Sequence, residues 1–357
     1  MLSGMATNQV PDTLRRVWRI PKAGSLGRLA LREEPLAAPA PGEVQVEVAA
    51  CGVNFADVFA CLGLYSATPA GSFIPGLECA GHIRRVGEGV QAWREGDAVI
   101  VLTRFGGYAD ALNVDARTLH PVPSGWSLIE AAAYPVQALT AWYGLVPLGN
   151  VRRDAVVLVQ SAAGGVGLNA LHALATLGAT AVAVVGTPAK RDFLQQKFGL
   201  PAARIVLRDR GFARGLDAAL ASLGARGFDV VFDAVYGEAF KRLFERLAPE
   251  GRYVLYGAAD FMSGGSRPNL LRLAAQYLRR PRLDPLAMMP QNRALMAFNL
   301  IWLWEQAERL PESMRATLAL IGAKPHVGEV FDFAAAHAAL AAIQSGRTTG
   351  KLVLAAR

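Results

Sequence analysis

A short apolar run, a glycine-rich turn, a helical pattern and a second apolar run follow one another between residues 156 and 186. This order predicts a strand, a turn, a helix and a second strand, and the turn fits the fingerprint of dinucleotide-binding folds. In that fingerprint the second glycine lets the backbone approach a pyrophosphate, and the third lets the helix pack closely on the strand. We therefore expect dinucleotide binding here rather than a purely structural turn. The turn residues expected at the cofactor are Ala162, which replaces the first glycine, and Gly164, Gly165, Val166 and Gly167.

The residues after the second predicted strand indicate which dinucleotide is bound. A cofactor without a 2′-phosphate usually finds an Asp or Glu here for its ribose hydroxyls, but no acid lies between Gly186 and Arg191. Thr187, Lys190 and Arg191 instead offer a hydroxyl and positive charge, and Arg208 could close over the same phosphate. The sequence therefore favours NADP(H), although Lys190 and Arg191 could also be ordinary solvated residues at a helix start.

Composition limits the class of protein. The 357 residues are 52% hydrophobic and 18% charged, which suits a globular chain of two domains. The net charge of +8 comes from scattered Arg and Lys residues without a nucleic-acid-binding motif, so we expect no nucleic-acid partner. Residues 155–189 contain no charged residue, but glycines and a proline interrupt them, so no membrane span is predicted. Three cysteines suit a reducing compartment, and residues 1–12 lack the order of a signal peptide, so we expect a cytoplasmic protein.

The pattern of elements changes along the chain. Residues 1–138 show short alternating strands separated by Pro and Gly, which predicts a β-rich domain. Residues 139–298 alternate buried strands with amphipathic helices, which predicts a doubly wound parallel sheet. Residues 299–357 return to strands and one helix, and we expect them to fold back on the N-terminal domain.

Several segments together resemble the medium-chain dehydrogenase/reductase superfamily, in its zinc-free quinone oxidoreductase (zeta-crystallin-like) branch. Asn292-Arg293, which precedes an expected helix, and Lys324-Pro325-His326, which precedes an expected strand, look most like the subgroup of the synaptic vesicle amine transport protein homologue. The resemblance covers nearly the whole chain after about residue 15. The segments that carry it are Cys51-Gly52-Val53-Asn54-Phe55-Ala56-Asp57, Pro75-Gly76-Leu77-Glu78-Cys79-Ala80-Gly81, Val86-Gly87-Glu88-Gly89-Val90, Gly96-Asp97 and Ala162-Ala163-Gly164-Gly165-Val166-Gly167.

The resemblance implies an α/β fold in which both chain ends form a GroES-like catalytic domain and a Rossmann domain is inserted between them. It also implies an NADPH-dependent reductase for quinones or α,β-unsaturated carbonyls. A homodimer joined through the Rossmann sheets is implied too, although the strand expected near residues 283–289 carries prolines at both ends. Zinc is not expected, because Leu77 stands where zinc-binding relatives have a His and three cysteines cannot form a four-Cys lobe. Cys51 with Glu78 and His82 is the remaining alternative for a metal site.

The resemblance also assigns candidate catalytic residues. Asn54 would orient the substrate carbonyl, and Asp57 would position its neighbours or cap the following helix. Many relatives have a Tyr two residues after this Asp, where this chain has Phe59. Tyr65 could supply the missing phenol from a loop, although it could also be an ordinary packed aromatic residue.

Four further residues match positions near the cofactor in this superfamily. The Thr140 hydroxyl is expected near the nicotinamide, although a Thr inside a helix can also bond back to the preceding turn. Tyr256 and Gly257 end a predicted strand at its carboxyl end, where doubly wound folds bind ligands. Lys351 matches a motif at the domain interface and is a weaker candidate for a cofactor contact.

Three functions remain open at this point. The first is an NADPH-dependent quinone or enone reductase acting on a small apolar substrate. The second is a cofactor-binding protein with vestigial activity that serves in interaction or lipid handling, which Phe59 and the positive charge motivate. The third is an enoyl reductase whose substrate is tethered to a carrier protein.

Overall fold

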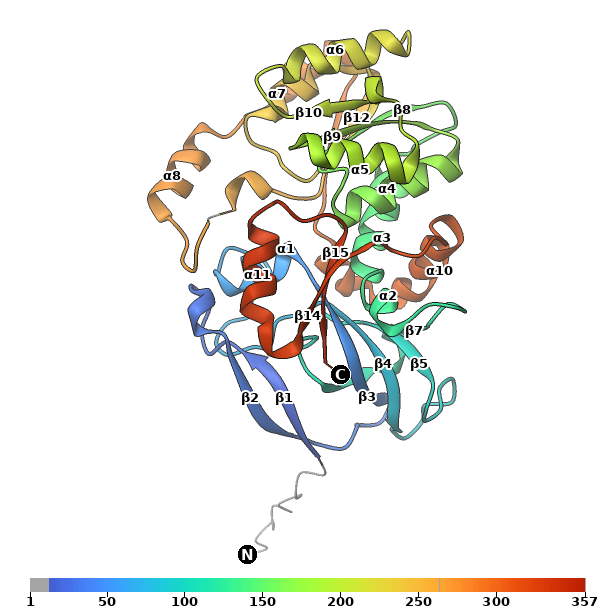
Figure 1. Ribbon diagram of the computed structural model, residues 1–357, viewed down its shortest axis with the longest axis vertical. Coiled ribbons are helices and arrows are strands. Elements are labelled where there is room, and N and C mark those ends of the chain that lie inside the picture. The colour runs from blue at the N-terminus through green and yellow to red at the C-terminus, as the bar shows by residue number, and fades with distance from the viewer. Residues whose placement is uncertain (1–12, 263, 357) are drawn as a thin grey trace, which may run out of the picture.

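A computed structural model of the chain describes residues 13–262 and 264–356. Residues 1–12, for which no signal peptide is expected, lie outside the described residues. One end of the molecule holds a six-stranded parallel sheet and the other holds a mostly antiparallel β-rich part (Figure 1). The parallel sheet has the order β10-β9-β8-β11-β12-β13. Its strands are β8 (Val156–Val159), β9 (Thr180–Val185), β10 (Ile205–Leu207), β11 (Phe228–Asp233), β12 (Leu247–Leu255) and β13 (Ala294–Ala297).

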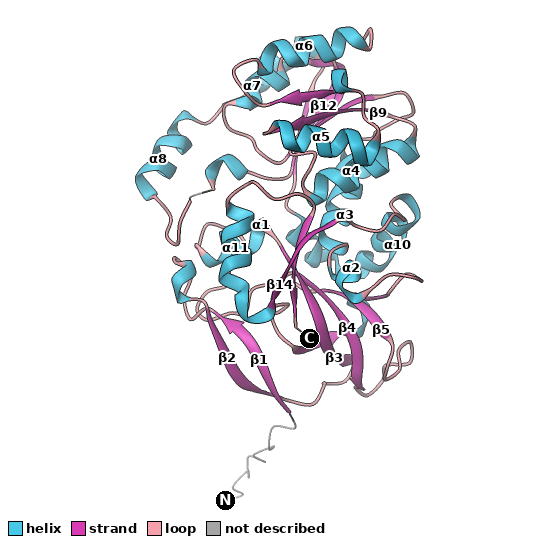
Figure 2. Cartoon of the chain, in the orientation of Figure 1, coloured by secondary structure: helices cyan, strands magenta, loops and turns pink. Residues whose placement is uncertain are grey.

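Helices cover both faces of this sheet. Successive side chains of a strand point to opposite sides, so the buried apolar residues of a strand such as β8 pack against helices on each face. Val157 and Val159 of β8 pack with α3 (Pro135–Tyr143) and α4 (Gly165–Leu177). Leu158 packs on the other side with α6 (Phe212–Ser222) and α7 (Ala239–Phe244). The predicted doubly wound sheet is therefore confirmed, and Figure 2 shows its alternation of strands and helices.

The second large sheet contains strands from both ends of the chain. Its order is β14-β15-β3-β4-β5-β7, and β6 pairs with β3. The C-terminal β15 runs antiparallel to β3, which confirms the expected return of the chain end to the N-terminal part. The elements of this part are β1 (Thr13–Arg19), β2 (Ala30–Leu36), β3 (Glu43–Val53), α1 (Phe55–Cys61), β4 (Glu78–Val86), β5 (Ala98–Leu102), β6 (Ala111–Asp115), β7 (Leu119–Pro121), α2 (Leu128–Ala132), α10 (Leu310–Leu320), β14 (Val327–Asp332), α11 (Ala336–Gln344) and β15 (Lys351–Ala355).

The two parts meet at the glycine-rich turn. The Gly350 amide, just before β15, donates to the Ala163 carbonyl at 2.9 Å. The predicted boundary at residues 138/139 falls inside α3, which is continuous across it. The boundaries at 138/139 and 298/299 stay predictions.

One expected strand is wrong. Residues 283–289 hold the short helix α9 (Pro285–Met288) instead of a strand, and the edge strand is β13, farther along the chain. Prolines lack the amide proton that a sheet ladder needs, so the prolines around this segment move the edge strand beyond them. Asn292-Arg293 consequently precedes a strand rather than a helix. In the part of the chain that the structure describes, no helix is both long and apolar enough to cross a membrane.

Candidate functional site

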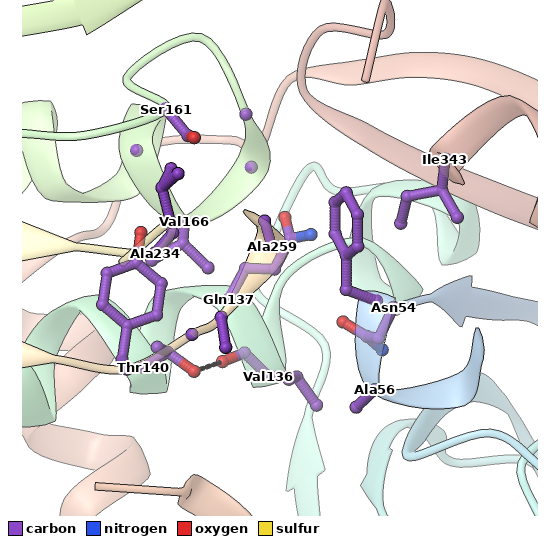
Figure 3. Close-up of a pocket in the computed structure, with 18 of the residues that line it drawn as sticks. Asn54, Ala56, Val136, Gln137, Thr140, Ser161, Val166, Ala234, Ala259 and Ile343 are labelled. Atoms are coloured by element: carbon purple, nitrogen blue, oxygen red, sulfur yellow. Dashed lines mark hydrogen bonds between the residues drawn. The ribbon is translucent and has the colours of Figure 1, made fainter. Parts of the chain in front are cut away.

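A cavity of about 870 Å³ lies between the two sheets. The glycine-rich turn and the carboxyl ends of β8, β9 and β12 line one part of its wall. The start of α1, the loop after it and the segment after β13 line the other part. Figure 3 shows Asn54, Gln137, Thr140 and Val166 around this space.

The glycine-rich turn begins α4 at the cavity wall. Gly164 is the N-cap of α4, so the amides of the first helical turn are available to a negatively charged ligand. A Cβ on Gly167 would lie 2.5 Å from the Ala162 Cα and 2.5 Å from the Ser161 carbonyl oxygen. Gly167 therefore permits the close approach of helix and turn that the fingerprint requires. Ala162 is buried behind the turn and is not in the cavity wall.

A methyl group at Gly167 tests this close approach. We expect Gly167→Ala to lower the free energy of unfolding by about 2 kcal/mol, because the new Cβ overlaps backbone atoms that cannot move aside cheaply. Gly186→Ala is the matched control, since a Cβ there would meet nothing within 4 Å. Urea denaturation of both variants measures the difference, and equal stabilities would contradict the assigned role of Gly167.

Two cations and a hydroxyl gather at the end of the cavity beyond β9. Thr187, Lys190 and Arg208 all line the wall there. Lys190 Nζ donates to the Gly346 carbonyl at 2.6 Å, and burial followed by the nearby Arg208 charge lowers its pKa. A dianionic group would relieve this repulsion between the two cations. Arg191 differs from the expectation, because it lies outside the cavity wall and its Nε pairs with Asp192 Oδ1 at 3.1 Å.

A buried ion pair contacts Asn54 at the end of the cavity away from Lys190 and Arg208. Lys351 and Glu78 are 1% and 0% exposed, and the Lys351 ammonium donates to a Glu78 carboxylate oxygen. Lys351 Nζ also donates to Asn54 Oδ1 at 2.7 Å, and Asn54 Nδ2 donates to Glu78 Oε1 at 2.8 Å. Both ends of the Asn54 amide are thus fixed, with the oxygen toward the ammonium. The expected contact between Lys351 and the cofactor is corrected, because its side chain is held by this network and lies outside the cavity wall.

Asp57 organises the backbone beside this network and does not reach the cavity wall. Its carboxylate accepts from the Asn54 amide at 2.8 Å, from the Gly76 amide at 3.2 Å and from the Tyr108 hydroxyl at 2.9 Å. The first of these contacts ties the carboxylate to the N-cap residue of α1, as in a capping box. Asp57 therefore positions the segment that carries Asn54, which was one of its two expected roles.

Burial raises the pKa of Asp57 to about 6, against 3.8 for an exposed Asp. Between these two values the folded state binds the proton more strongly than the unfolded state, so stability falls as pH rises. We expect this carboxyl to remove about 2 kcal/mol of unfolding free energy between pH 4 and pH 7. Denaturant unfolding of the natural protein and of Asp57→Asn at both pH values measures this term as a difference of differences. An identical pH dependence in the two proteins would contradict it.

Tyr65 and Thr140 both line the cavity. The Tyr65 hydroxyl donates to Asn299 Oδ1 at 2.7 Å, and burial raises its pKa to about 12, so the phenol keeps its proton at neutral pH. The Thr140 hydroxyl donates to the Val136 carbonyl at 2.6 Å, one helical turn earlier (Figure 3). Thr140 thus makes the intrahelical bond that was its alternative interpretation. Phe59 lines the cavity too, without a hydroxyl to offer.

Two glutamines in the cavity wall were missed by the sequence analysis. Gln137 Oε1 and both side-chain polar atoms of Gln160 are buried, and none has a hydrogen-bond partner among the described residues. A buried polar atom without a partner is costly, so these amides are suited to a polar ligand. A Cβ on Gly165 would lie 1.5 Å from Gln137 Oε1, so this glycine makes room for the amide. A glutamine beside Thr140 or at a strand end carries no distinctive sequence signal.

The predicted site residues divide into two sets. Those outside the cavity wall are Asp57, Ala162, Arg191 and Lys351. Those that line it are Asn54, Tyr65, Thr140, Gly164, Gly165, Val166, Gly167, Gly186, Thr187, Lys190, Arg208, Tyr256 and Gly257. The roles predicted for these residues stay predictions.

The donor set beside Asn54 does not fit zinc. Within the described ranges, no three His, Cys, Asp or Glu side chains gather as a metal ion requires. Cys51 is fully buried, burial raises the pKa of its thiol, and its Sγ lies 3.8 Å from the Ala109 carbonyl oxygen. The Lys351 ammonium already neutralises Glu78 and would repel a second cation there.

Comparison with known proteins identifies the family. Residues 40–124 match the alcohol dehydrogenase GroES-like domain, and residues 202–354 match the family described as zinc-binding dehydrogenase. The chain is 30% identical over 343 residues to the synaptic vesicle membrane protein VAT-1 homolog of Homo sapiens, covering 93% of this chain and 84% of the human protein. The chain belongs to the medium-chain dehydrogenase/reductase superfamily. Within this superfamily of oxidoreductases it lies in the branch of VAT-1 homologues and quinone oxidoreductases.

The Danio rerio protein of the same name is 31% identical over 316 residues, and the chain spans 64% of its length. Solved structures of the superfamily cover nearly the whole chain. A mycobacterial protein complexed with NADPH has a TM-score of 0.80 and 26% identity, over 95% of this chain and 99% of the other. A mycobacterial quinone oxidoreductase has a TM-score of 0.76 and 27% identity, over 96% of this chain and 99% of the other. The CurK enoyl reductase has a TM-score of 0.77 and 28% identity, with the same coverage.

Proposed function

We propose that the protein is a zinc-independent reductase that uses NADPH to reduce a quinone or an α,β-unsaturated carbonyl. The observation that carries this proposal is that one continuous cavity joins a cationic end at Lys190 and Arg208 to an apolar end beside Asn54. Its volume of about 870 Å³ suits a dinucleotide and a small substrate together. The mycobacterial relative with NADPH supports the choice of cofactor.

The residues of the cavity wall fit NADP(H). The first-turn amides of α4 would hold the pyrophosphate, and Gly257 at the end of β12 would leave room for the nicotinamide ribose. Thr187, Lys190 and Arg208 would hold the 2′-phosphate through charge-assisted hydrogen bonds. When bound, this cofactor supplies a hydride to an electrophilic carbon.

Asn54 would donate a hydrogen bond to the carbonyl oxygen of the substrate. The Lys351 ammonium faces Asn54 Oδ1 and Glu78 accepts one proton of Nδ2, so the second Nδ2 proton is left for an acceptor in the cavity. Fixed in this way, the Asn54 amide can only donate, which suits a carbonyl oxygen that gains negative charge. Apolar side chains line the neighbouring wall and would exclude water from the reacting atoms; they are Phe59, Leu64, Phe298, Leu300, Ile301 and Trp304.

The direct test mixes the purified protein with NADPH and a panel of 1,4-benzoquinone, 9,10-phenanthrenequinone, alkenals and 2-alkenones. We expect loss of NADPH absorbance with at least one of these acceptors. Tight cofactor binding without turnover of any acceptor would instead favour the vestigial cofactor-binding function.

Tyr65 is the proposed proton donor, because Phe59 cannot serve and the Tyr65 hydroxyl lies in the cavity wall. We expect Tyr65→Phe to lower kcat by about 100-fold, the usual contribution of a positioned general acid. The KM for NADPH should stay unchanged, since the cationic end is untouched. Steady-state kinetics measures both values, and an unchanged kcat would mean that the proton comes from elsewhere.

A carrier-tethered enoyl substrate is the second candidate. It is favoured by 36% identity over 226 residues to the reducing polyketide synthase rads1 of Floropilus chiversii, of which the chain spans 9%, and by the likeness to the CurK enoyl reductase. Activity on a carrier-bound enoyl thioester, without activity on free quinones, would favour this candidate over the first.

The family resemblance also implies a homodimer. Among the described strands β13 lies at the edge of the parallel sheet and pairs with β12. An antiparallel pairing of two such edges would extend the sheet across both subunits. Light scattering during gel filtration gives the mass, and a monomer at micromolar concentration would contradict this part of the proposal.

A further inference from the structure

Gln137, on α3, carries a buried polar atom at the cavity wall that nothing in the protein satisfies. The residue is 8% exposed, and its Oε1 accepts no hydrogen bond from any of the described residues. A buried amide oxygen without a donor costs free energy. A ligand that donates to this oxygen would therefore recover the cost, so Gln137 points to a specific part of whatever fills the cavity.

The amide of Gln137 lies against the first turn of α4. A Cβ added to Gly165, the first residue of that helix, would have as its three nearest atoms Oε1, Cδ and Nε2 of Gln137, at 1.5, 2.2 and 2.6 Å. The missing side chain of Gly165 thus gives the amide its place beside the helix start. The same turn carries the backbone amides that would hold a pyrophosphate, so a group attached to the pyrophosphate lies within reach of Gln137.

The neighbours of Gln137 indicate which side of the pyrophosphate it faces. The cationic end of the cavity, proposed for the 2′-phosphate, lies beyond β9. Gln137 instead follows Val136, whose amide donates to Glu78 Oε2 at 2.7 Å, and Glu78 also accepts from Asn54 Nδ2. In Figure 3 Gln137 lies between the glycine-rich turn and Asn54. Gln137 therefore belongs to the end of the cavity where the nicotinamide half would lie.

The group between the pyrophosphate and the nicotinamide is a ribose with two hydroxyls. A hydroxyl both donates and accepts, and an amide has an acceptor oxygen and a nitrogen with two donor hydrogens. Pyrophosphate oxygens only accept, so they would leave Oε1 without a donor. The nicotinamide carboxamide also donates and accepts, but it lies one group farther from the helix start.

We propose that Gln137 binds the hydroxyls of the nicotinamide ribose, with Oε1 accepting from one hydroxyl and Nε2 donating to the other. This inference rests on the proposed function, because it takes NADP(H) as the ligand of the cavity. It assigns to Gln137 the task of holding the ribose between the first turn of α4 and Asn54, which is proposed to hold the substrate carbonyl.

The test compares the natural protein with Gln137→Met, which keeps the length of the side chain and removes both polar atoms. Three ligands are titrated by calorimetry: adenosine 2′-phosphate 5′-diphosphate, which ends at the pyrophosphate; 2′-phospho-ADP-ribose, which adds the ribose; and NADP+, which adds the nicotinamide. We expect Gln137→Met to weaken binding of the second and third ligands equally, by about tenfold for two lost hydrogen bonds, and to leave the first unchanged.

Gln196→Met is the matched control. Gln196 is exposed on α5 (Pro188–Phe198) and lies outside the cavity wall, so this variant should bind all three ligands as the natural protein does. Urea denaturation without ligand checks the fold. Gln137→Met should be at least as stable as the natural protein, because it removes a buried oxygen that has no donor among the described residues.

Unchanged affinities in Gln137→Met would overturn the proposal. A loss confined to NADP+ would assign the amide to the nicotinamide, and an equal loss of all three ligands with lower stability would assign it a structural role; either result also overturns the proposal. If the natural protein binds none of the three ligands, the proposed function fails together with this inference. If it binds NADP+ and only the pattern in Gln137→Met differs from expectation, this inference alone fails.

Discussion

Lys351→Met should lower the free energy of unfolding by about 3–5 kcal/mol, because it leaves the Glu78 carboxylate buried without its cation. It should also lower kcat, since the ammonium no longer fixes the oxygen end of the Asn54 amide. Urea denaturation measures the first effect, and NADPH oxidation with a quinone measures the second. Lys351→Arg, which keeps the charge, should retain more stability than Lys351→Met.

A double variant separates the structural role of the ion pair from its positioning role. Lys351→Met combined with Glu78→Gln removes both charges, so we expect most of the lost stability to return. The activity should stay low, because the amide of Asn54 has lost the cation that sets its direction. Recovery of stability and activity together would mean that the network supports the fold alone.

Replacing both Lys190 and Arg208 by Gln should weaken NADPH binding by about 100-fold or more and leave NADH binding nearly unchanged. Each charge-assisted hydrogen bond to a phosphate contributes about 1.5–3 kcal/mol, and two are removed. The preference for NADPH over NADH should therefore disappear. Fluorescence titration of the two cofactors measures both affinities.

Arg191→Gln is the matched control for this experiment. Arg191 carries the same charge as Lys190 and lies with it on α5 (Pro188–Phe198), but it is outside the cavity wall and pairs with Asp192. We expect less than a threefold change in NADPH affinity, attributable to long-range charge alone. A loss as large as that of the double variant would contradict the location assigned to the 2′-phosphate.

The parallel sheet and the glycine-rich turn could be predicted because their signals are local. A β-branched run such as residues 156–159 and a turn that needs Gly167 can each be recognised in a short window of sequence. The strand that the family resemblance implied near residues 283–289 was wrong, because this segment contains prolines and forms a short helix instead. The local rule against proline in a strand decided the outcome.

The network behind the cavity could not be predicted from local patterns. Asn54, Glu78 and Lys351 come from positions up to 297 residues apart, and they meet because β3 pairs with both β4 and β15. The family motif located Lys351 near the domain interface, but the direction of its side chain depends on the register of β15. The outward apolar side chains of α8 (Leu270–Arg279) were missed for a similar reason. An amphipathic pattern has two faces, and the sequence does not say which one meets the protein.

The measurement that tests the central claim most directly is a titration of the purified protein with NADPH and with NADH, followed at once by NADPH oxidation with 1,4-benzoquinone and a simple enone. The proposed site predicts tighter binding of NADPH than of NADH, followed by turnover of at least one acceptor. Binding of neither cofactor would contradict the assignment of the cavity, beginning with the glycine-rich turn.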